Sequence, residues 1–546
     1  MSKTSPLLAV AAALALSTVG TSALSVLGSI AHTKILPRAM DVKAEYDYII
    51  VGGGTSGLTV ADRLTESGEL NSTALNLVAG GLAGYRDPTL SLRFPSAPQE
   101  GLNGRSFGVV HGLMLGGSTG VNAMQVHRGQ KEDYNRWGSY FSDNSEWSWD
   151  EHEVAAFAEI EGVDLPPDSG AGEPGVFWYP LSSDPVTRTR SMARKGHWDG
   201  IEAARDNYET ITGQRVLRVL FDGETAVGVS FVGANSTTTE GARTVKAKKE
   251  VVIATGAIRT PQLLQRSGVG PKSLLEAAGI DVVVDLPGVG QNFQDHPVGA
   301  GATFRFTNFN IHPDMTDLEN NQTFIDLAQS EFEANRTAPD TFEQITAAYE
   351  SQDPAAYLPA GTDATVIAGY AVQQKAHAAA LRSKGAAFYN LFLRGAPTES
   401  NFVLLHPMSR GTIEIDTSNP FFKDPVVDYR ALSNPTDIDI QVEFIRFTRK
   451  YFLKTSLVQF APEETVPGAN VTSFEGLSAA VRAQVSPTTF HPVGTAAMLP
   501  RELGGVVDEK LLVYGVKRLS VVDASIQPDL PGAYTQQTVY AVAEKT

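Results

Sequence analysis

The chain has 546 residues, of which 42% are hydrophobic and 19% charged, and it contains no cysteine. This length and composition predict a folded protein with several domains or two large ones, and they exclude general disorder. Without cysteine, the chain forms no disulfide, iron–sulfur cluster or thiolate zinc site and carries no cysteine nucleophile. The net charge of −17 repels phosphate backbones, so we expect no nucleic-acid partner. The ten histidines show no HExxH or HxH spacing, and we therefore predict no metal site.

Residues 1–23 predict a signal peptide. Lys3 supplies a positive start, residues 7–16 are a ten-residue apolar stretch, and the small residues 21–23 offer a cleavage point. The alternative is a buried Ala-rich helix. No later apolar run reaches 18 residues, so we expect no membrane span. We predict a protein that is secreted, or that resides in the lumen of the secretory pathway. Sequons for N-glycosylation agree with export and occur at Asn71, Asn235, Asn321, Asn335 and Asn470.

The segment after residue 45 predicts a β-α-β unit. Residues 46–51 are β-rich and apolar, and glycines and a run with helical spacing follow them. Residues 74–79 form a second short apolar run. A strand, a helix and a second strand in this order indicate parallel strands.

A glycine-rich loop follows the first of these strands. Residues 52–57 read GGGTSG, which matches GxGxxG at the head of a helix and includes Thr55 and Ser56. Gly52 permits the turn, Gly54 lets the backbone approach a pyrophosphate, and Gly57 lets the helix pack on the strand. We predict a dinucleotide site at the helix N-terminus, with an ordinary tight turn as the alternative.

The ribose end of this site departs from the pattern. The fingerprint expects an acidic residue at the end of the second strand, where this chain has Val78. Valine cannot accept hydrogen bonds from ribose hydroxyls. Either another group binds the ribose, or the cofactor is held loosely, or it is absent.

Later segments predict a second layer of structure. Residues 244–256 read as a strand that leads into a helix at 260–267. Residues 300–306 and 402–416 alternate between apolar and polar, which favours antiparallel strands. Residues 316–383 are rich in Ala, Gln and Glu and predict helices.

Six long segments carry a further signal. Three of them are GLNGRSFGVVHGLMLGGSTGVNAMQVHRG (101–129), GAIRTPQLLQRSGVG (256–270) and FHPVGTAAM (490–498). The others are LPGVGQNFQDHP (286–297), LLHPMSRGTIEID (404–416) and the segment 521–545. Together they resemble the glucose–methanol–choline (GMC) oxidoreductases, which are FAD-dependent alcohol oxidases and dehydrogenases. The resemblance covers nearly the whole chain after residue 45.

The resemblance implies a fold of class α/β plus α+β. A discontinuous Rossmann-type FAD-binding domain is expected from residues 45–135, 190–300 and 485–546. An inserted substrate-binding domain, built on an antiparallel sheet, is expected from residues 136–189 and 301–484.

The resemblance also assigns the cofactor site, with FAD bound non-covalently and less tightly than usual because of Val78. His111 and Leu113 replace the usual Arg/Lys pattern before LGGS, which removes cationic partners from the flavin region. Gly52, Gly54, Thr55, Ser56 and Gly57 are assigned to the pyrophosphate, Gly116, Gly117, Ser118 and Asn122 to the flavin, Val216 to the adenine side, and Asp523 and Ala524 to the isoalloxazine ring.

His491 is the predicted catalytic base. Alcohol oxidation needs a group that takes the hydroxyl proton, and an imidazole with a pKa near ~6.5 suits that role. A histidine that merely caps the turn before Pro492 is the alternative. Tyr534 occupies the second catalytic position, where the family usually has His or Asn, and is expected to orient the substrate hydroxyl. We interpret His296 and His406 as packing or hydrogen-bonding residues.

The predicted function is a secreted FAD-dependent oxidation of a small-molecule alcohol to a carbonyl, in secondary metabolism. One alternative on the same fold is a non-redox cyclase similar to versicolorin B synthase, which would tolerate Val78 and Tyr534. A second is a serine hydrolase, because residues 116–120 match GxSxG around Ser118. A third is a non-catalytic glycoprotein or a defective gene product. The oligomeric state is left open.

Overall fold

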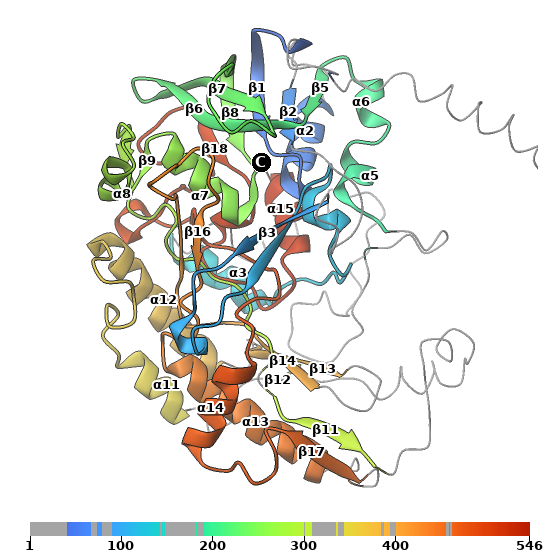
Figure 1. The fold of residues 1–546 in the computed structure, drawn as a ribbon, viewed down its shortest axis with the longest axis vertical. Helices are drawn as coiled ribbons and strands as arrows, with labels where there is room; N and C mark the ends of the chain where they lie inside the picture. Colours follow the sequence, from blue (N-terminus) through green and yellow to red (C-terminus); the bar gives the residue numbers. More distant parts are fainter. Residues whose placement is uncertain are drawn as a thin grey trace, which may run out of the picture.

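The computed structural model describes residues 36, 41–66, 74–78, 90–141, 145, 147, 182, 190–299, 301–307, 335–336, 343–383, 387–393, 400–454, 458 and 461–545. The predicted signal peptide and the sequons at Asn71 and Asn321 lie outside these residues. Figure 1 shows a large sheet at one end of the molecule and a group of helices and small sheets at the other.

The large sheet is built from strands that are distant in sequence. Its order is β5–β2–β1–β8–β7–β6, and β18 pairs with β8. β1 runs parallel to β2 and to β8, whereas β7 is antiparallel to β6 and β8. The predicted parallel β-α-β unit is therefore confirmed. The bounds are β1 Glu45–Val51, β2 Ala74–Val78, β5 Tyr208–Thr212, β6 Gln214–Asp222, β7 Thr225–Gly233, β8 Arg243–Ile253 and β18 Leu519–Val521.

Helices pack on this sheet and are tied to one another across long sequence distances. α2 (Thr55–Glu66) lies beside α15 (Gln536–Lys545), and Arg63 Nε donates to Glu544 Oε2 over 2.5 Å. The predicted helix at 260–267 is α7, which begins earlier, at Gly256. The other helices here are α3 (Lys131–Ser139), α5 (Ala193–His197), α6 (Ile201–Ala204) and α8 (Lys272–Ala277), with 3-10 helices η3 (Gly117–Gly120), η6 (Arg501–Leu503) and η7 (Ala524–Ile526).

The rest of the described chain contains helices and several small antiparallel sheets, and most of these elements are seen in the lower half of Figure 1. β11 (Thr303–Phe306) pairs with β17 (Pro462–Val466), and β15 (Thr412–Glu414) with β16 (Val426–Asp428). The predicted antiparallel strands are confirmed, but the described residues divide them among separate sheets because each strand is short. The remaining elements are β12 (Asn335–Arg336), β13 (Tyr389–Leu393), β14 (Ser400–Leu404), α11 (Glu343–Glu350), α12 (Ala364–Arg382), α13 (Thr436–Lys454) and α14 (Phe474–Gln484).

Two further short pairs of strands lie outside the large sheet. β3 (Ser91–Pro95) is antiparallel to β4 (Gly108–Gly112), and β9 (Val269–Gly270) is parallel to β10 (Val284–Asp285). The 3-10 helix η2 (Glu100–Leu102) lies between β3 and β4. The exact domain boundaries stay a prediction. Among the described helices, none combines the length and apolar composition that crossing a membrane requires.

Candidate active site

Three functional segments leave the large sheet at the same edge. Val51 of β1 and Val521 of β18 both pair with Ile253 of β8, so these parallel strands end side by side. Ligands of open parallel sheets bind outside the carboxyl ends of the strands, where the chain turns to opposite sides. The glycine loop, residues 254–256 and residues 522–524 therefore meet at one edge.

The three motif glycines of the first loop meet different surroundings. A Cβ on Gly52, whose φ is +121°, would lie 2.1 Å from the Ala254 carbonyl oxygen, and one on Gly57 would lie 2.0 Å from that of Gly52. A Cβ on Gly54 would meet only the Gly117 Cα, at 3.9 Å. Gly52 and Gly57 are thus required by internal packing. Gly54 instead borders open space, which suits the approach of a cofactor.

A second glycine turn closes on the first. The Gly116 N–H donates to the Gly53 carbonyl over 2.8 Å, and a Cβ on Gly117 would lie 2.7 Å from the Gly54 Cα. The two turns expose backbone rather than side chains to the space beside α2. The first turn of α2 contains no acidic residue, so its free N–H groups and positive dipole end suit a pyrophosphate. The residues present therefore fit FAD.

Ser118 lies in this second turn and is exposed. Its Oγ accepts from the Gly112 N–H over 3.3 Å. The turn is the 3-10 helix η3, not the strand–turn–α-helix elbow that a nucleophilic serine needs. The serine hydrolase alternative is thus wrong, because no elbow presents Ser118 and His491 bonds other groups.

Asn122 and Asp523 bind protein groups near these turns. Asn122 Nδ2 donates to Gln536 Oε1 over 2.5 Å, which joins the second turn to the start of α15. Asp523 is buried and accepts from the Gly256 N–H at 2.9 Å and from Thr260 Oγ1 at 2.6 Å, which explains the early start of α7. Burial raises the Asp523 pKa. Ala524 begins η7, and Val216 lies in β6 opposite Phe231. Their flavin contacts stay predictions.

The region around His111 contains a cation that the sequence comparison missed. A Cβ on Gly256 would lie 3.2 Å from His111 Cε1, so this ring faces the start of α7. Burial and the Arg259 guanidinium lower the pKa of His111 to about 4. Arg259 of α7, whose Nη2 lies 2.9 Å from Asp424 Oδ1, is therefore a cation close to His111. That His111 and Leu113 remove cationic partners from the flavin stays a prediction.

His491 belongs to a cluster of rings in which His296 and His127 are buried and His491 and Tyr534 are half-buried. Its Nδ1 lies 2.9 Å from Nδ1 of His296 and 2.9 Å from Thr489 Oγ1. Its ring meets the Tyr534 ring edge to face, with centroids 4.9 Å apart. Burial lowers the His491 pKa to about 3, far from the value near 6.5 expected from the sequence. The imidazole is therefore neutral at neutral pH, which is the form that a general base requires.

His127 is the site residue that the sequence reasoning missed. Its ring also meets the Tyr534 ring edge to face, with centroids 4.8 Å apart and an interplanar angle of 83°. It is 2% exposed, and burial together with His491 lowers its pKa to about 3. The signal was available, since His127 ends the same family-like segment that carries the second glycine turn.

A buried carboxyl group shapes the loop before His491. Asp295 accepts from the backbone N–H groups of His491 at 3.0 Å and His296 at 2.8 Å, and from Thr488 Oγ1 at 2.5 Å. Burial raises its pKa to about 7 despite these hydrogen bonds. Phe490 adopts a left-handed φ of +67°, which turns the chain just before His491. Asp295 therefore positions the catalytic loop.

The loop 528–534, which carries Tyr534, is held by side chains from other segments. The Pro528 carbonyl accepts from Asn292 Nδ2 at 2.8 Å, Gln294 Nε2 at 3.0 Å and Gln373 Nε2 at 2.9 Å. Further bonds join His406 Nδ1 to the Leu530 carbonyl (3.1 Å), His296 Nε2 to the Pro531 carbonyl (3.1 Å), Gln130 Nε2 to the Gly532 carbonyl (3.2 Å) and the Gly532 N–H to Asp133 Oδ2 (2.8 Å). His296 and His406 are hydrogen-bonding residues, as predicted.

A buried ion network supports this loop. Asp529 lies 3.2 Å from Arg136 Nε and 3.5 Å from Arg410 Nη2, and Arg136 Nη2 is 3.1 Å from Asp133 Oδ1. Two arginines and two aspartates balance in charge. Burial opposes the charge of Asp529, but its cationic neighbours outweigh that effect and hold its pKa well below the usual range. Burial lowers the pKa of the adjacent His377 to about 4, so the arginines supply the positive charge.

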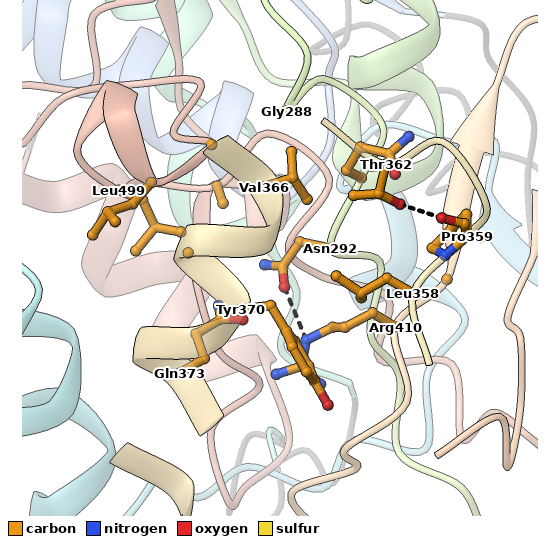
Figure 2. Close-up of a pocket in the computed structure, with 16 residues that line it drawn as sticks. Gly288, Asn292, Leu358, Pro359, Thr362, Val366, Tyr370, Gln373, Arg410 and Leu499 are labelled. Atoms are coloured by element: carbon orange, nitrogen blue, oxygen red, sulfur yellow. Dashed lines mark hydrogen bonds between the residues drawn. The ribbon is translucent and has the colours of Figure 1, made fainter. Parts of the chain in front are cut away.

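A pocket lies next to the side chains that hold the 528–534 loop. Figure 2 shows α12 on one side of it and Asn292 and Arg410 on the other, with Arg410 Nε bonded to Asn292 Oδ1 over 2.9 Å. The pocket encloses about 420 Å³, including solvent at its mouth, and has none of the predicted site residues in its lining. It shares Asn292, Gln373 and Arg410 with the structure that holds the 528–534 loop. It is therefore adjacent to the site but separate from the His491 cluster.

Comparisons with known proteins agree with this geometry. Two family models, each described as GMC oxidoreductase, match residues 46–163 with 185–298 and residues 407–543. These matches cover more than half of the chain, which therefore belongs to the GMC oxidoreductases. The resemblance, the fold class, the FAD cofactor and the predicted enzyme class, FAD-dependent alcohol oxidation, are confirmed.

Individual relatives span nearly the whole chain. The chain is 32% identical to dehydrogenase xptC of Emericella nidulans, over 94% of each protein. It is similar to a solved FAD-dependent oxidoreductase from Chaetomium thermophilum, with 32% identity and a TM-score of 0.80, over 92% of this chain and 98% of that one. A structure described as a new fungal aryl-alcohol oxidase has 31% identity and a TM-score of 0.81, with the same coverage.

Proposed function

We propose that His491 is the general base of this alcohol oxidation and that Tyr534 orients the substrate hydroxyl. The observation that carries this assignment is the neutral, half-buried His491 ring, whose centroid lies 4.9 Å from that of the Tyr534 ring. Both residues lie in segments that match the family. Their roles stay predictions until variants are measured.

The reaction divides between the chain and its cofactor. Nε2 of His491 takes the hydroxyl proton as the alcohol carbon loses hydride, and a carbonyl product forms. Bound FAD would supply the acceptor for the hydride, which carries both electrons. The glycine loop at 52–57, the turn at 116–120 and the N-terminus of α2 would hold this cofactor. The remaining rings exclude water from the reacting centre and keep the imidazole neutral.

The substrate is, on this proposal, an alcohol attached to an aromatic or conjugated group. Two of the rings around the base, Tyr534 and His127, meet edge to face, which is the geometry in which a planar substrate is also bound favourably. The similar fungal structure is described as an aryl-alcohol oxidase, which supports the same class.

A matched pair of substrates tests this proposal. Benzyl alcohol and cyclohexylmethanol have similar size, but only the first is planar and conjugated. We expect flavin bleaching under anaerobic conditions with benzyl alcohol and a kcat/KM at least about tenfold lower with cyclohexylmethanol, because a lost aromatic contact costs about 0.5–1.5 kcal/mol and the saturated carbinol lacks conjugation. Equal rates would reject the aromatic class. A flavin-loaded protein that no alcohol reduces would reject the function and favour the non-redox alternative.

We further propose that the protein is exported and glycosylated and acts in secondary metabolism. The apolar segment at 7–16 supports export, and the described sequons at Asn235 and Asn470 lie on exposed turns. Expression of the full chain in a fungal host should yield protein in the medium that begins after residue 23. Asn235→Gln and Asn470→Gln should each remove one deglycosylation-sensitive mass increment. Protein retained in the cytosol with an intact N-terminus would reject export.

A further inference from the structure

On the basis of this proposed function, we infer that His296 is a positioning residue that fixes the tautomer of His491. It holds the proton of neutral His491 on Nδ1 and so leaves Nε2 as the atom that accepts the substrate proton. Neither residue determines this alone, because the Pro531 carbonyl sets the state of His296 first.

The Pro531 carbonyl determines which nitrogen of His296 carries hydrogen. Nε2 of His296 lies 3.1 Å from the Pro531 oxygen, and a carbonyl can only accept. Nε2 must therefore bear the hydrogen. His296 is 1% exposed, and burial and the neighbouring His491 hold its pKa well below the usual range, although the carbonyls of Pro531 and Leu405 act in the opposite direction. The ring is neutral, so its Nδ1 carries a lone pair.

The contact between the two imidazoles then determines which nitrogen of His491 carries the hydrogen. The Nδ1 atoms of His296 and His491 are 2.9 Å apart, a distance that requires one hydrogen between them. Because Nδ1 of His296 can only accept, Nδ1 of His491 is the donor. Thr489 Oγ1, also 2.9 Å away, can accept from the same N–H. Neutral imidazole has a single N–H, so Nε2 of His491 is unprotonated.

The free nitrogen is also the one left for the substrate. In the described part of the chain, the hydrogen bonds of the His491 ring are those at Nδ1. When Nε2 takes a proton, Nδ1–H continues to donate to His296, so proton transfer needs no ring rotation. Thr489 could not replace His296 in this role, because a hydroxyl both donates and accepts and selects neither tautomer.

The hydrogen bonds from the Pro531 carbonyl through His296 to His491 also link the base to the loop that carries Tyr534. Pro531 lies three residues before Tyr534, in the loop held by the Asp133, Gln130 and His406 side chains. The same carbonyl that anchors this loop orients His296. Correct placement of the loop and the correct tautomer of His491 are therefore set together.

Two substitutions at His296 separate this role from simple packing. His296→Gln supplies an amide that can donate to Pro531 and accept from His491, whereas His296→Leu can do neither. We expect kcat to fall about ten- to a hundredfold in H296L, as for other residues that orient a reacting group, with KM changed only a few-fold. H296Q should retain kcat within a few-fold. A packing role would instead lower stability equally in both variants and leave kcat similar.

The tautomer itself is measurable without turnover. In protein labelled with ¹⁵N-histidine, the signals absent from His491→Gln identify His491, and their shifts show which nitrogen is protonated. We expect protonation on Nδ1 in the wild-type FAD-loaded enzyme, H296Q and Thr489→Ala, and a mixture in H296L. Protonation of His491 on Nε2 in the wild type overturns the inference, even if H296L fails to fold. Nδ1 protonation in an enzyme that oxidises no alcohol would reject the proposed function and leave this inference standing.

Discussion

The Tyr534 ring meets the His491 ring edge to face, with centroids 4.9 Å apart and an interplanar angle of 75°. The two residues are in contact, but they differ in their ability to act as a base. The imidazole is neutral and has a lone pair for a proton, whereas a phenol with a pKa near ~10 is a poor base at neutral pH.

The two residues should therefore contribute unequally to turnover. His491→Ala should lower the rate of flavin reduction by ~10²–10⁴, the usual value of general-base assistance. Tyr534→Phe should cost about one neutral hydrogen bond, near ~1 kcal/mol or several-fold in rate. Tyr534→His should remain active. Stopped-flow absorbance of the flavin measures all three, and the reverse ranking would show that the family roles do not transfer.

The pH profile of the same reaction gives a separate test. The neutral form of His491 is the active one, and burial lowers its pKa to about 3. Its protonation, and so the loss of activity on the acid side, should therefore occur well below the ordinary histidine value near ~6.5. We expect the rate of flavin reduction to stay nearly constant from pH 7.5 down to about 5.5. A tenfold loss centred near pH 6.5 would contradict the burial of this base.

Substitutions at two glycines of the first loop should affect folding and cofactor binding differently. Gly57→Ala places a Cβ 2.0 Å from the Gly52 oxygen and should destabilise the flavin-free protein by several kcal/mol. Gly54→Ala meets only the Gly117 Cα at 3.9 Å, so the flavin-free protein should keep its melting temperature. FAD affinity should nevertheless fall about tenfold or more, because the methyl group occupies the space beside the pyrophosphate. Thermal melts of the flavin-free protein and flavin fluorescence titrations measure the two effects. Unchanged affinity in G54A would place the phosphates elsewhere.

The end of β2 offers a gain-of-affinity test. Val78 is the last residue of β2, which lies directly beside β1 and its glycine loop. Val78→Glu supplies the missing acceptor for the ribose hydroxyls and should tighten FAD about ten- to a hundredfold, since a hydrogen bond to a charged group is worth ~1.5–3 kcal/mol. Val78→Leu is the control and should leave affinity unchanged. Dialysis followed by absorbance at the flavin band would show this, and equal flavin loss from all three proteins would contradict it.

Buried histidines should make the protein sensitive to acid. Burial lowers the pKa to about 4 for His111 and His377 and to about 3 for His127 and His491, whereas the unfolded value is near ~6.5. The unfolded chain binds more protons in this window, so the free energy of unfolding falls as pH drops from ~6.5 towards ~4. Asp295, with its pKa raised to about 7, has the opposite sign, as have Asp437 and Asp523, whose pKa values burial also raises. His296, whose pKa burial lowers, adds to the effect of the four histidines.

A single variant checks this explanation. Each such histidine contributes up to ~1.4 kcal/mol per pH unit within the window. His377→Gln should therefore make the free energy of unfolding less dependent on pH between 4.5 and 6, in urea titrations at several pH values. A slope identical to the wild type would show that His377 does not titrate on unfolding.

Part of this architecture could be predicted from the sequence because its determinants are local. Apolar runs and the glycines at 52–57 predicted the parallel β-α-β unit, and alternation at 300–306 and 402–416 predicted antiparallel strands. The site itself depends on long-range contacts. His296 and His491 are 195 residues apart, and Asp529 meets Arg136 across 393, so no local pattern reveals either pairing. His127 and Arg259 were missed for the same reason, since their importance comes from what the fold places beside them.

The three hydrogen bonds to the Pro528 carbonyl have an evolutionary consequence. They are donated by side chains outside the loop. Side chains outside the loop also bind the next residues, where the Gly532 carbonyl accepts from Gln130 and the Gly532 N–H donates to Asp133. The course of the main chain at position 534 therefore does not depend on the residue found there. The resemblance implies His or Asn at this position, and this chain carries Tyr. Such a scaffold lets natural or directed evolution exchange the group that meets the substrate while the base and the fold stay in place. A mutant library confined to position 534 should therefore yield mostly folded, flavin-binding proteins that differ in the alcohols they accept.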